Sequence, residues 1–274
     1  MFGKILENVN KKHPLVHAIT NYVTVNDCAN MALACGSAPI MADDINEVEE
    51  IVSICNALVI NIGTLNERTI ASMIRAGQKA NQLGLPVILD PVGAGASKLR
   101  TDTALELLEQ VKFAVVRGNI SEIKTIDQGS GTTKGVDADS NDALNDGNLD
   151  QIVQFTKRLS EKTGAVIAIT GAIDVVADQK KAFVIKNGHP MMSRITGTGC
   201  MLTTVIGGYC GANPDDLLVA TATAVSCMGL CGELAFEKVW AQKEGTASFR
   251  TYIIDFMSNM NAEMLERGMK IETR

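Results

Sequence analysis

The chain has 274 residues, of which 46% are hydrophobic, and its formal net charge is −6 at pH 7. This length supports a sizeable core and either one large α/β domain or two small ones. The acidic balance and the lack of a basic stripe argue against nucleic-acid binding. Because apolar runs are short and interrupted, no membrane span is expected. The first residues, MFGKILENVNKKHPL, lack the apolar segment of a signal peptide.

The first half of the chain alternates between helical and strand patterns. Residues 22–35 predict a helix that ends at Gly36. Residues 57–63 and 86–93 are apolar on both faces, which is typical of buried parallel strands. The segment between them predicts a helix with Asn66 as its N-cap. One face of that helix carries its apolar and small residues, Ile70, Met73, Ile74, Gly77 and Ala80.

Thr101 is predicted to cap the next helix, with Leu105, Leu108 and Val111 facing inward. Apolar strands recur at 113–119 and 165–171. Strands and helices that alternate at short intervals indicate βαβ units.

The remaining segments complete the predicted order. Residues 127–150 are polar and rich in turn residues, which favours a surface loop, with or without one helical turn. Residues 173–188 predict a strand pair around a charged turn at 178–181. The pattern is helical from residue 198 and ends in a long helix around 246–266. No linker or repeat is visible, so we expect one α/β domain over 1–274, with a mostly parallel sheet and helices on both faces.

Polar residues that follow the predicted strands are candidates for chemistry, because ligands of open α/β sheets bind beyond the carboxyl ends of the strands. Asp90 ends one strand, Thr170 ends another, and Arg117 lies in a third that is followed by Asn119 and Glu122. The later helix opens with the turn Gly197, Thr198, Gly199 and Cys200.

This set of residues suits phosphoryl transfer, which depends on charge stabilisation and alignment. Free N–H groups at 197–200 are suited to hold a phosphoryl group. Asp90 and Glu122 are candidate Mg²⁺ ligands, directly or through water, and Arg117 is a candidate partner of nucleotide phosphates. Each piece also has an ordinary structural interpretation, as a turn residue, a surface ion pair or a tight turn. Their joint occurrence at successive strand ends favours the functional one.

Other motifs give weaker signals. GAGASK at 93–98 lacks the third glycine of a dinucleotide fingerprint, and no P-loop motif is present. His17 is interpreted as a core residue rather than one that faces substrate. The seven cysteines show no paired zinc spacing, and all except Cys200 are interpreted as small core residues in a reducing cytoplasm.

Five blocks, in this order, carry a family resemblance: HAITNYVTVNDCANMALACGSAPIMADD, LVINIGTLN, VILDPVGAGAS, VVRGNISEI and ITGTGCMLT. They resemble the hydroxyethylthiazole kinases of the ribokinase-like superfamily over nearly the whole chain. The resemblance implies a ribokinase-like fold and ATP- and Mg²⁺-dependent phosphorylation of 4-methyl-5-(2-hydroxyethyl)thiazole, a step of thiamine salvage. It also implies a homotrimer with active sites between subunits.

The resemblance also implies roles for individual residues. Met41 and Gly197 match the thiazole site, and Asn21, Val23 and Gly63 lie in stretches expected to line it. Arg117 and Thr170 match the nucleotide site. Asn119 and Glu122 match the Asn-x-x-Glu magnesium motif of the superfamily.

Cys200 stands where sugar kinases of the superfamily carry an aspartate base. The thiazole kinases share this departure, so the role of Cys200 as base or spacer stays open. A helix N-terminus lowers the pKa of a thiol, whereas nearby phosphates raise it. Three alternatives remain: a kinase of pyrimidine or pyridoxal alcohols, a nucleotide-repair dehydratase, and a non-catalytic nucleotide sensor. The first two are expected to keep an acidic residue at this position.

Overall fold

The structure is a computed structural model of the chain and describes residues 1–131 and 147–274. Most of the surface loop predicted at 127–150 lies outside these residues. At the two ends of the predicted loop, the helix α6 ends at Gln128 and the helix α7 begins at Leu149.

The described residues form one nine-stranded sheet in the order β2-β1-β3-β4-β5-β6-β7-β8-β9. Six neighbouring strands are parallel: β1 Leu15–Ile19, β2 Ala38–Ile40, β3 Ala57–Asn61, β4 Val87–Asp90, β5 Val115–Gly118 and β6 Val166–Ile169. Three antiparallel strands extend one edge: β7 Asp174–Ala177, β8 Ala182–Ile185 and β9 Ile271–Thr273. The predicted α/β fold with a mostly parallel sheet is confirmed.

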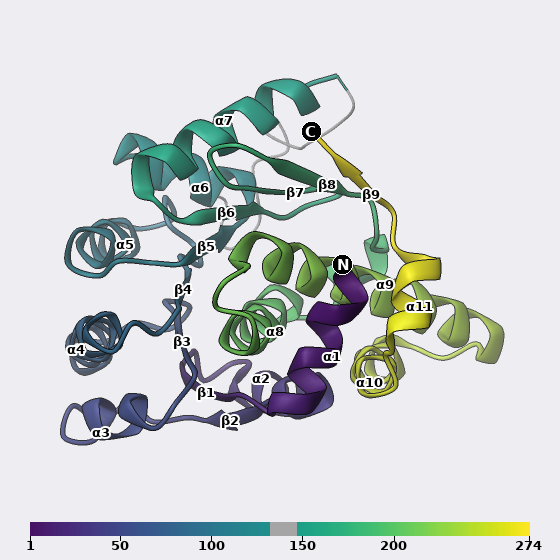
Figure 1. Cartoon of the computed structure of the whole chain (residues 1–274), viewed down its shortest axis with the longest axis horizontal. Coiled ribbons are helices and arrows are strands. Elements are labelled where there is room, and N and C mark those ends of the chain that lie inside the picture. The colour runs from purple at the N-terminus through teal and green to yellow at the C-terminus, as the bar shows by residue number, and fades with distance from the viewer. Residues whose placement is uncertain (132–146) are drawn as a thin grey trace.

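Helices cover both faces of the sheet (Figure 1). One face carries α3 Val48–Ser53, α4 Glu67–Gln82, α5 Lys98–Gln110, α6 Ile120–Gln128 and α7 Leu149–Thr163. The other carries α1 Phe2–Lys12, α2 Val25–Ala34, α8 Thr198–Ala212, α9 Leu217–Gln242, α10 Thr246–Ser258 and α11 Ala262–Gly268, with the 3₁₀ turn η2 Pro190–Arg194 preceding α8. Side chains of each central strand alternate between the two cores: in β4, Ile88 faces the α8 side, and Val87 and Leu89 face the opposite side.

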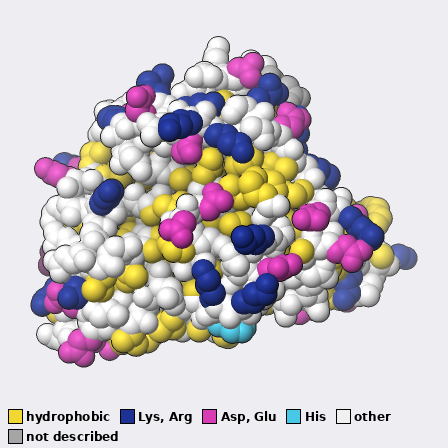
Figure 2. Space-filling model, in the orientation of Figure 1, with side chains coloured by type: hydrophobic (Ala, Val, Ile, Leu, Met, Phe, Trp, Pro, Cys, Tyr) yellow, Lys and Arg dark blue, Asp and Glu magenta, His cyan; other side chains and the backbone are white. Residues whose placement is uncertain are grey.

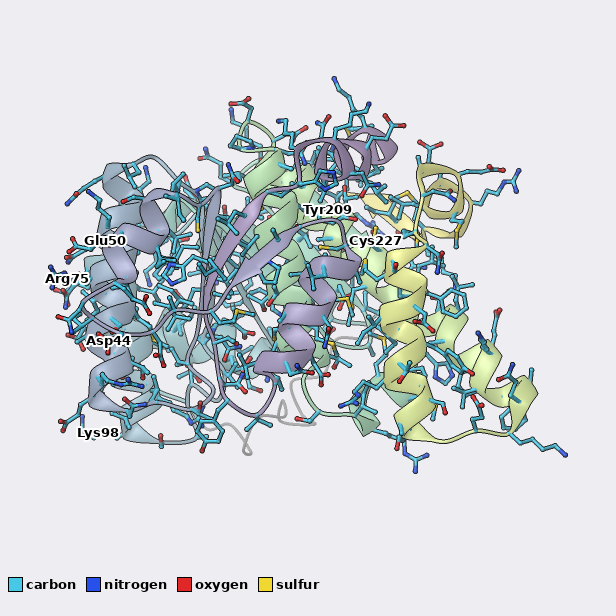
Figure 3. All side chains as sticks on the ribbon, turned by 90° about the horizontal axis from the view of Figure 1, so that it is seen from below. Asp44, Glu50, Arg75, Lys98, Tyr209 and Cys227 are labelled. Carbon is cyan, nitrogen blue, oxygen red and sulfur yellow. The ribbon has the colours of Figure 1, made fainter. Side chains whose placement is uncertain are left out.

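The α8–α9 pair forms the centre of one core. Tyr209 of α8 and Cys227 of α9 are buried, and the Tyr209 hydroxyl donates to the Cys227 sulfur at 3.4 Å. Both residues are labelled in Figure 3. Burial raises the pKa of Cys227 to about 12. Six of the seven cysteines are buried and Cys200 is partly exposed, which confirms their interpretation as core residues.

The surface and the long helix α9 bear on two expectations from composition, those about nucleic acid and about membrane spans. On the face shown in Figure 2, Lys and Arg side chains are interspersed with Asp and Glu, without a stripe of one sign. Among the described residues, one helix, α9, is long and apolar enough to cross a membrane. However, 78% of its most apolar window is buried inside the protein. Such burial is typical of a core helix.

Two local predictions are confirmed. Asn66 caps α4 in a reciprocal capping box with Thr69. The strand pair is β7 and β8, whose turn is closed by Asp178 Oδ1, which accepts hydrogen bonds from the backbone N–H groups of Lys180 and Lys181.

Three boundary predictions were wrong. Ser97, not Thr101, caps α5. The buried face of this helix therefore carries Thr103, Ala104 and Leu107, whereas the predicted Leu105 and Leu108 are only partly buried. The helix predicted at 22–35 begins at Val25. The long helix expected around 246–266 is broken between α10 and α11, because the Asn261 side chain accepts from Met264 N and starts a new helix.

Candidate active site

Polar side chains converge at the carboxyl ends of β3 to β6, opposite the N-terminus of α8. The parallel register places Asn61 directly beside Asp90, and Arg117 lies on the next strand along the sheet. Thr170 follows β6, and Cys200 lies in the first turn of α8.

Asp90 is the fully buried acid at the centre of this cluster. Its Oδ2 accepts hydrogen bonds from Asn61 Nδ2 and Thr203 Oγ1, both at 2.8 Å. Its Oδ1 lies 3.4 Å from Arg117 Nη1. Burial raises the pKa of Asp90, while the positive charge of Arg117 opposes that rise.

Arg117 links the acid to the predicted nucleotide residues. Its Nη2 donates to Thr170 Oγ1 at 2.6 Å, so the structure brings together the two residues predicted to bind nucleotide. The side chain is only 13% exposed, and within the described part of the chain its Nε–H has no hydrogen-bond acceptor. A buried guanidinium with an unused donor is suited to receive an anionic ligand.

Glu122 and Asn119 form the N-terminal capping box of α6. Glu122 Oε2 accepts from Asn119 N at 2.8 Å, and its Oε1 accepts from Gly93 N at 2.7 Å. The side chain is buried, and its pKa is raised to about 7 by burial and then by the charge of Asp90. Both carboxylate oxygens therefore support the turn after β4 and the start of α6.

The turn before α8 requires glycine. Gly197 has a φ of +89°, and a Cβ there would lie 2.6 Å from Thr24 Cγ2. The first helical residues are Thr198, Gly199 and Cys200. Because the first N–H groups of a helix have no partner within it, these amides make the turn a candidate anion-binding turn.

Cys200 lies between two amide donors. Asn21 Nδ2 and Asn61 Nδ2 are each 3.3 Å from its sulfur. Burial, followed by the charge of Asp90, raises the pKa of Cys200, while the hydrogen bonds from Thr24, Asn61 and Asn21 lower it. The net direction is upward, so in this state the thiol is protonated near neutral pH.

The residues predicted to bind the thiazole divide into two groups. Asn21, Gly63 and Gly197 lie around Cys200. Asn21 contacts its sulfur, a Cβ on Gly63 would contact the side chains of Asn21 and Asn61, and Gly197 is the residue just before α8. Val23 precedes α2 and is 57% exposed. Met41 is half-buried after the edge strand β2, next to Ala42.

His17 is buried, and its Nε2–H donates to the Ala42 carbonyl oxygen, 2.7 Å away. Its interpretation as a core residue is confirmed.

Comparison with known proteins assigns the family. A sequence profile described as the hydroxyethylthiazole kinase family matches residues 6–263. The chain belongs to this family. It is 59% identical to a hydroxyethylthiazole kinase of Clostridium acetobutylicum over 273 residues, an alignment that covers 100% of each chain.

Solved structures agree. A hydroxyethylthiazole kinase protein from Pyrococcus horikoshii has a TM-score of 0.88 at 34% identity, covering 100% of this chain and 98% of that one. A ribokinase-like superfamily protein from Enterococcus faecalis has a TM-score of 0.62 at 12% identity, covering 94% and 89%. The second likeness concerns the fold alone and confirms the ribokinase-like architecture.

Sequence reasoning missed two polar members of this candidate site, Asn61 and Thr203. Asn61 ends the strand LVIN as Asp90 ends VILD, so the rule that selected Asp90 applies equally to Asn61. Thr203 gives no such signal. It reaches Asp90 because it lies one turn into α8.

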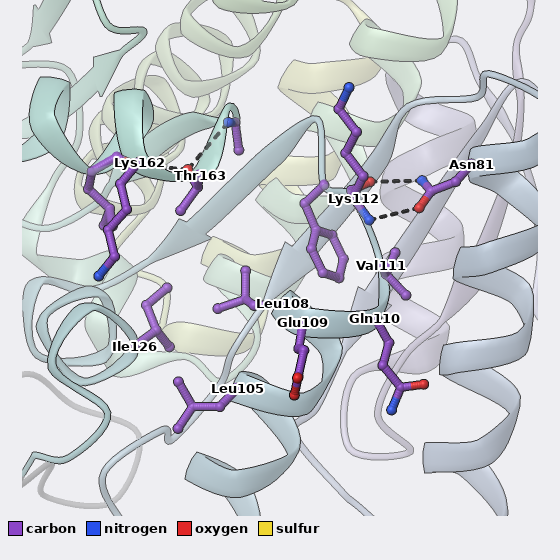
Figure 4. Close-up of a pocket in the computed structure, with 13 residues that line it drawn as sticks. Asn81, Leu105, Leu108, Glu109, Gln110, Val111, Lys112, Ile126, Lys162 and Thr163 are labelled. Carbon is purple, nitrogen blue, oxygen red and sulfur yellow. Dashed lines mark hydrogen bonds between the residues drawn. The ribbon is translucent and has the colours of Figure 1, made fainter.

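A cavity of about 550 Å³ lies away from these residues. It is lined by the C-terminal ends of α5 and α7 and by the segments before β5 and β6 (Figure 4). Its labelled side chains include Leu105, Leu108, Lys112 and Lys162. It therefore lies at the amino ends of the strands, opposite the candidate active site.

Proposed function

We propose that the protein transfers the γ-phosphoryl group of ATP to the hydroxyl of 4-methyl-5-(2-hydroxyethyl)thiazole, in thiamine synthesis or salvage. Family membership supports the activity. The observation that carries the proposal is that Arg117 lies over the first turn of α8, at Gly199, and also contacts Asp90. A phosphoryl group bound at this turn would meet a cation on one side and the substrate hydroxyl near Cys200 on the other.

The nucleotide would be held by Arg117 and Thr170, with Asn119 at the start of α6. Its terminal phosphate would accept hydrogen bonds from the amides of Thr198, Gly199 and Cys200. The partial positive charge of a helix N-terminus stabilises such an anion. Because phosphoryl transfer has a loose transition state, this stabilisation and alignment are the main contributions expected from the protein.

The two buried carboxylates fit a magnesium ion. The charge of Asp90 raises the pKa of Glu122, so the two acids repel each other. A divalent cation would relieve that repulsion. Because both Glu122 oxygens already accept backbone N–H groups and Asp90 Oδ2 accepts two side-chain donors, they would hold the ion mainly through water. When bound, the ion supplies neutralisation of phosphate charge.

The thiazole would lie between Asn21, Gly63 and Gly197 on one side and Val23 and Met41 on the other. This places its hydroxyethyl group near Cys200. Asn21 and Asn61 hold the thiol in place from the protein side.

We also propose a homotrimer in which a neighbouring subunit completes the thiazole site. The strand β2 ends the sheet order, so one of its edges is open, and α2 lies beside it (Figure 1). Val23 and Leu33, on or next to α2, are 57% and 60% exposed. An open strand edge with exposed apolar residues is suited to association with a second copy of the chain. Head-to-tail contacts that close after three subunits give three equivalent sites.

Two further proposals concern the chain as a whole. Residues 1–274 form one domain, because a single sheet takes strands from residues 15–19 and from residues 271–273. The protein works in the cytoplasm, where its seven unpaired cysteines remain reduced.

Purified protein incubated with ATP, Mg²⁺ and a panel of small alcohols tests the activity, with products identified by mass spectrometry. The proposal expects a thiazole phosphate and equimolar ADP. Phosphorylated pyridoxal or pyrimidine alcohols without the thiazole product would select a related kinase. ADP without any phosphorylated alcohol would indicate the repair dehydratase, and no nucleotide turnover by folded protein would indicate a sensor.

A further inference from the structure

Asn61 uses one amide group to join four parts of the candidate active site. It ends β3 and is 1% exposed. Its Nδ2 donates to Asp90 Oδ2 at 2.8 Å and lies 3.3 Å from the Cys200 sulfur. Its Oδ1 accepts from Asn21 Nδ2 at 3.0 Å and from Gly63 N at 2.9 Å.

The orientation of this amide is fixed by its partners. The backbone N–H of Gly63 can only donate, so the atom facing it must be the Asn61 oxygen. The nitrogen must then face the Asp90 carboxylate, which accepts. A flipped amide would face both partners with the wrong atom.

We infer that Asn61 is a positioning residue that fixes the Cys200 thiol and the Asp90 carboxylate relative to one another. Its single nitrogen lies against both groups, although they come from α8 and β4, which are far apart in the chain. The strand register holds Asn61 beside Asp90, so the amide cannot slide along the sheet.

The expected effect of Asn61 on turnover rests on the proposed function. In that function, Asp90 lies on the metal side of the transferred group and Cys200 lies beside the substrate hydroxyl. Alignment of reacting groups contributes strongly to rate, and small displacements are costly. Loss of the amide nitrogen should therefore slow turnover more than it weakens binding.

Asn61→Asp tests this role with almost no change of shape. The new side chain keeps an acceptor for Asn21 Nδ2 and Gly63 N. Its second oxygen replaces the donor that faces Asp90 and Cys200, so the two buried acids must repel each other or share a proton. We expect kcat to fall by about 10- to 100-fold, the size of one lost hydrogen bond to a charged group. KM for both substrates should change by less than about threefold.

Asn61→Ser serves as a second variant in case the added charge prevents folding. Serine is too short to reach both groups, so the same split between kcat and KM is expected. Asn213→Asp is the matched control: Asn213 is also buried, and its amide nitrogen donates to the carbonyl oxygens of Ile5 and Tyr209, away from the site. It should keep the kcat of the wild type.

A second readout does not depend on kinase activity. Cys200 is the partly exposed cysteine among seven, so iodoacetamide should modify it selectively. Without substrates and at one pH near 8, alkylation of Cys200 in Asn61→Asp should be at least about fivefold slower, because a carboxylate beside the sulfur disfavours the thiolate. Asn213→Asp should match the wild type.

Three results would overturn the inference. They are an unchanged kcat in both Asn61 variants, an equal loss in the Asn213 control, or an unchanged alkylation rate in Asn61→Asp. Failure of the wild type to make a thiazole phosphate would instead count against the proposed function. The alkylation comparison would still decide whether the side chain at position 61 lies against the thiol.

Discussion

Arg117 Nη1 lies against the α-carbon of Gly199, so closely that a Cβ on Gly199 would be 2.5 Å from it. The guanidinium thus covers the anion-binding turn of α8 while it contacts Asp90 and Thr170. A side chain at position 199 would have to displace the cation that we assign to the nucleotide phosphates.

Gly199→Ala should therefore reduce activity and should not raise stability. The displaced guanidinium would lose its contact with the buried Asp90 carboxylate. This loss opposes the gain of at most about 1 kcal/mol that alanine brings over glycine in a helix interior, so the melting temperature should stay the same or fall. The displaced Arg117 should raise KM for ATP by about tenfold, the effect of about 1.4 kcal/mol. Gly245→Ala is the control, since a Cβ on Gly245 meets nothing within 4 Å. Equal KM values in the two variants would show that Arg117 does not serve the nucleotide from this position.

Asp90→Asn should impair the metal-dependent step. The variant keeps the shape of the side chain and removes the charge that pairs with Arg117. We expect turnover to fall by at least about 100-fold, as for the loss of one preorganised electrostatic contact, and half-maximal activity to need more Mg²⁺. Titration of Mg²⁺ at saturating ATP and thiazole measures both quantities. An unchanged Mg²⁺ dependence would remove Asp90 from the metal side of the site.

Glu122→Gln must be judged separately for folding. A glutamine has one oxygen to face two backbone N–H groups, those of Gly93 and Asn119. We expect this variant to lose stability as well as turnover, because one buried N–H is left opposite the amide nitrogen. Thermal unfolding measured beside the Mg²⁺ titration separates the two effects, and full stability in Glu122→Gln would contradict the packing described here.

Assembly can be tested at the open edge of the sheet. Leu33→Glu places a charge on an α2 residue that is 60% exposed, whereas Leu83→Glu changes a 44%-exposed residue that caps α4 on the opposite helical layer. Light scattering should give three times the monomer mass of 29.2 kDa for the wild type and for Leu83→Glu. Leu33→Glu should give a smaller species with reduced activity. Full activity of a wild-type monomer would reject a site shared between subunits.

The sequence was sufficient to predict most strands, but not which residue begins each helix. The strands are apolar on both faces, so β3, β4 and β6 are visible without knowledge of their neighbours. Ser97 and Thr101 are equally good caps by type. Ser97 was selected because the turn after β4 ends there, and the Thr101 hydroxyl accepts from Gly95 N of that turn.

The sequence predicts which residues at the strand ends belong to the candidate site, but not which of their side chains contact one another. Asp90, Arg117 and Thr170 follow from the general rule for open sheets. The contact between Asn61 and Cys200 joins residues 139 positions apart and depends on how α8 docks on the sheet. The side-chain distances in that docking are set by packing of the whole core, which no local pattern encodes.

Asp174 gives the stability a defined pH dependence. Its pKa is raised to about 7 by burial, while its carboxylate accepts from Gly171 N at 2.9 Å. Between about pH 4 and 7 the folded protein therefore holds a proton that the unfolded chain releases, and stability falls as the pH rises through this range. The slope is at most about 1.4 kcal/mol per pH unit for this group.

Asp174→Asn removes this titration and keeps an oxygen for Gly171 N. Its free energy of unfolding, relative to the wild type, should therefore increase as the pH rises from about 5 to about 8. Urea unfolding at fixed protein concentration measures the difference, and taking that difference cancels the titration of Glu122, whose pKa is also raised to about 7. A difference that is constant with pH would show that Asp174 is ionised throughout.

The role of Cys200 is the last question that substitution can decide. A positioned base usually contributes about 10²- to 10⁴-fold. The loose transition state of phosphoryl transfer needs little early proton removal, and the pKa of this thiol is raised by burial and by Asp90. We therefore expect the turnover of Cys200→Ala to fall by less than this factor, because the backbone amides of the turn remain.

Cys200→Asp should stay active and turn over at least as fast as the wild type, since Asn21 and Asn61 already present two donors to this position. Repulsion from Asp90 and the phosphates opposes this, and Mg²⁺ should offset most of it. Turnover at saturating substrates, with folding checked, measures both variants. An inactive Asp variant beside an Ala variant reduced by more than about 10⁴-fold would make the thiol itself essential.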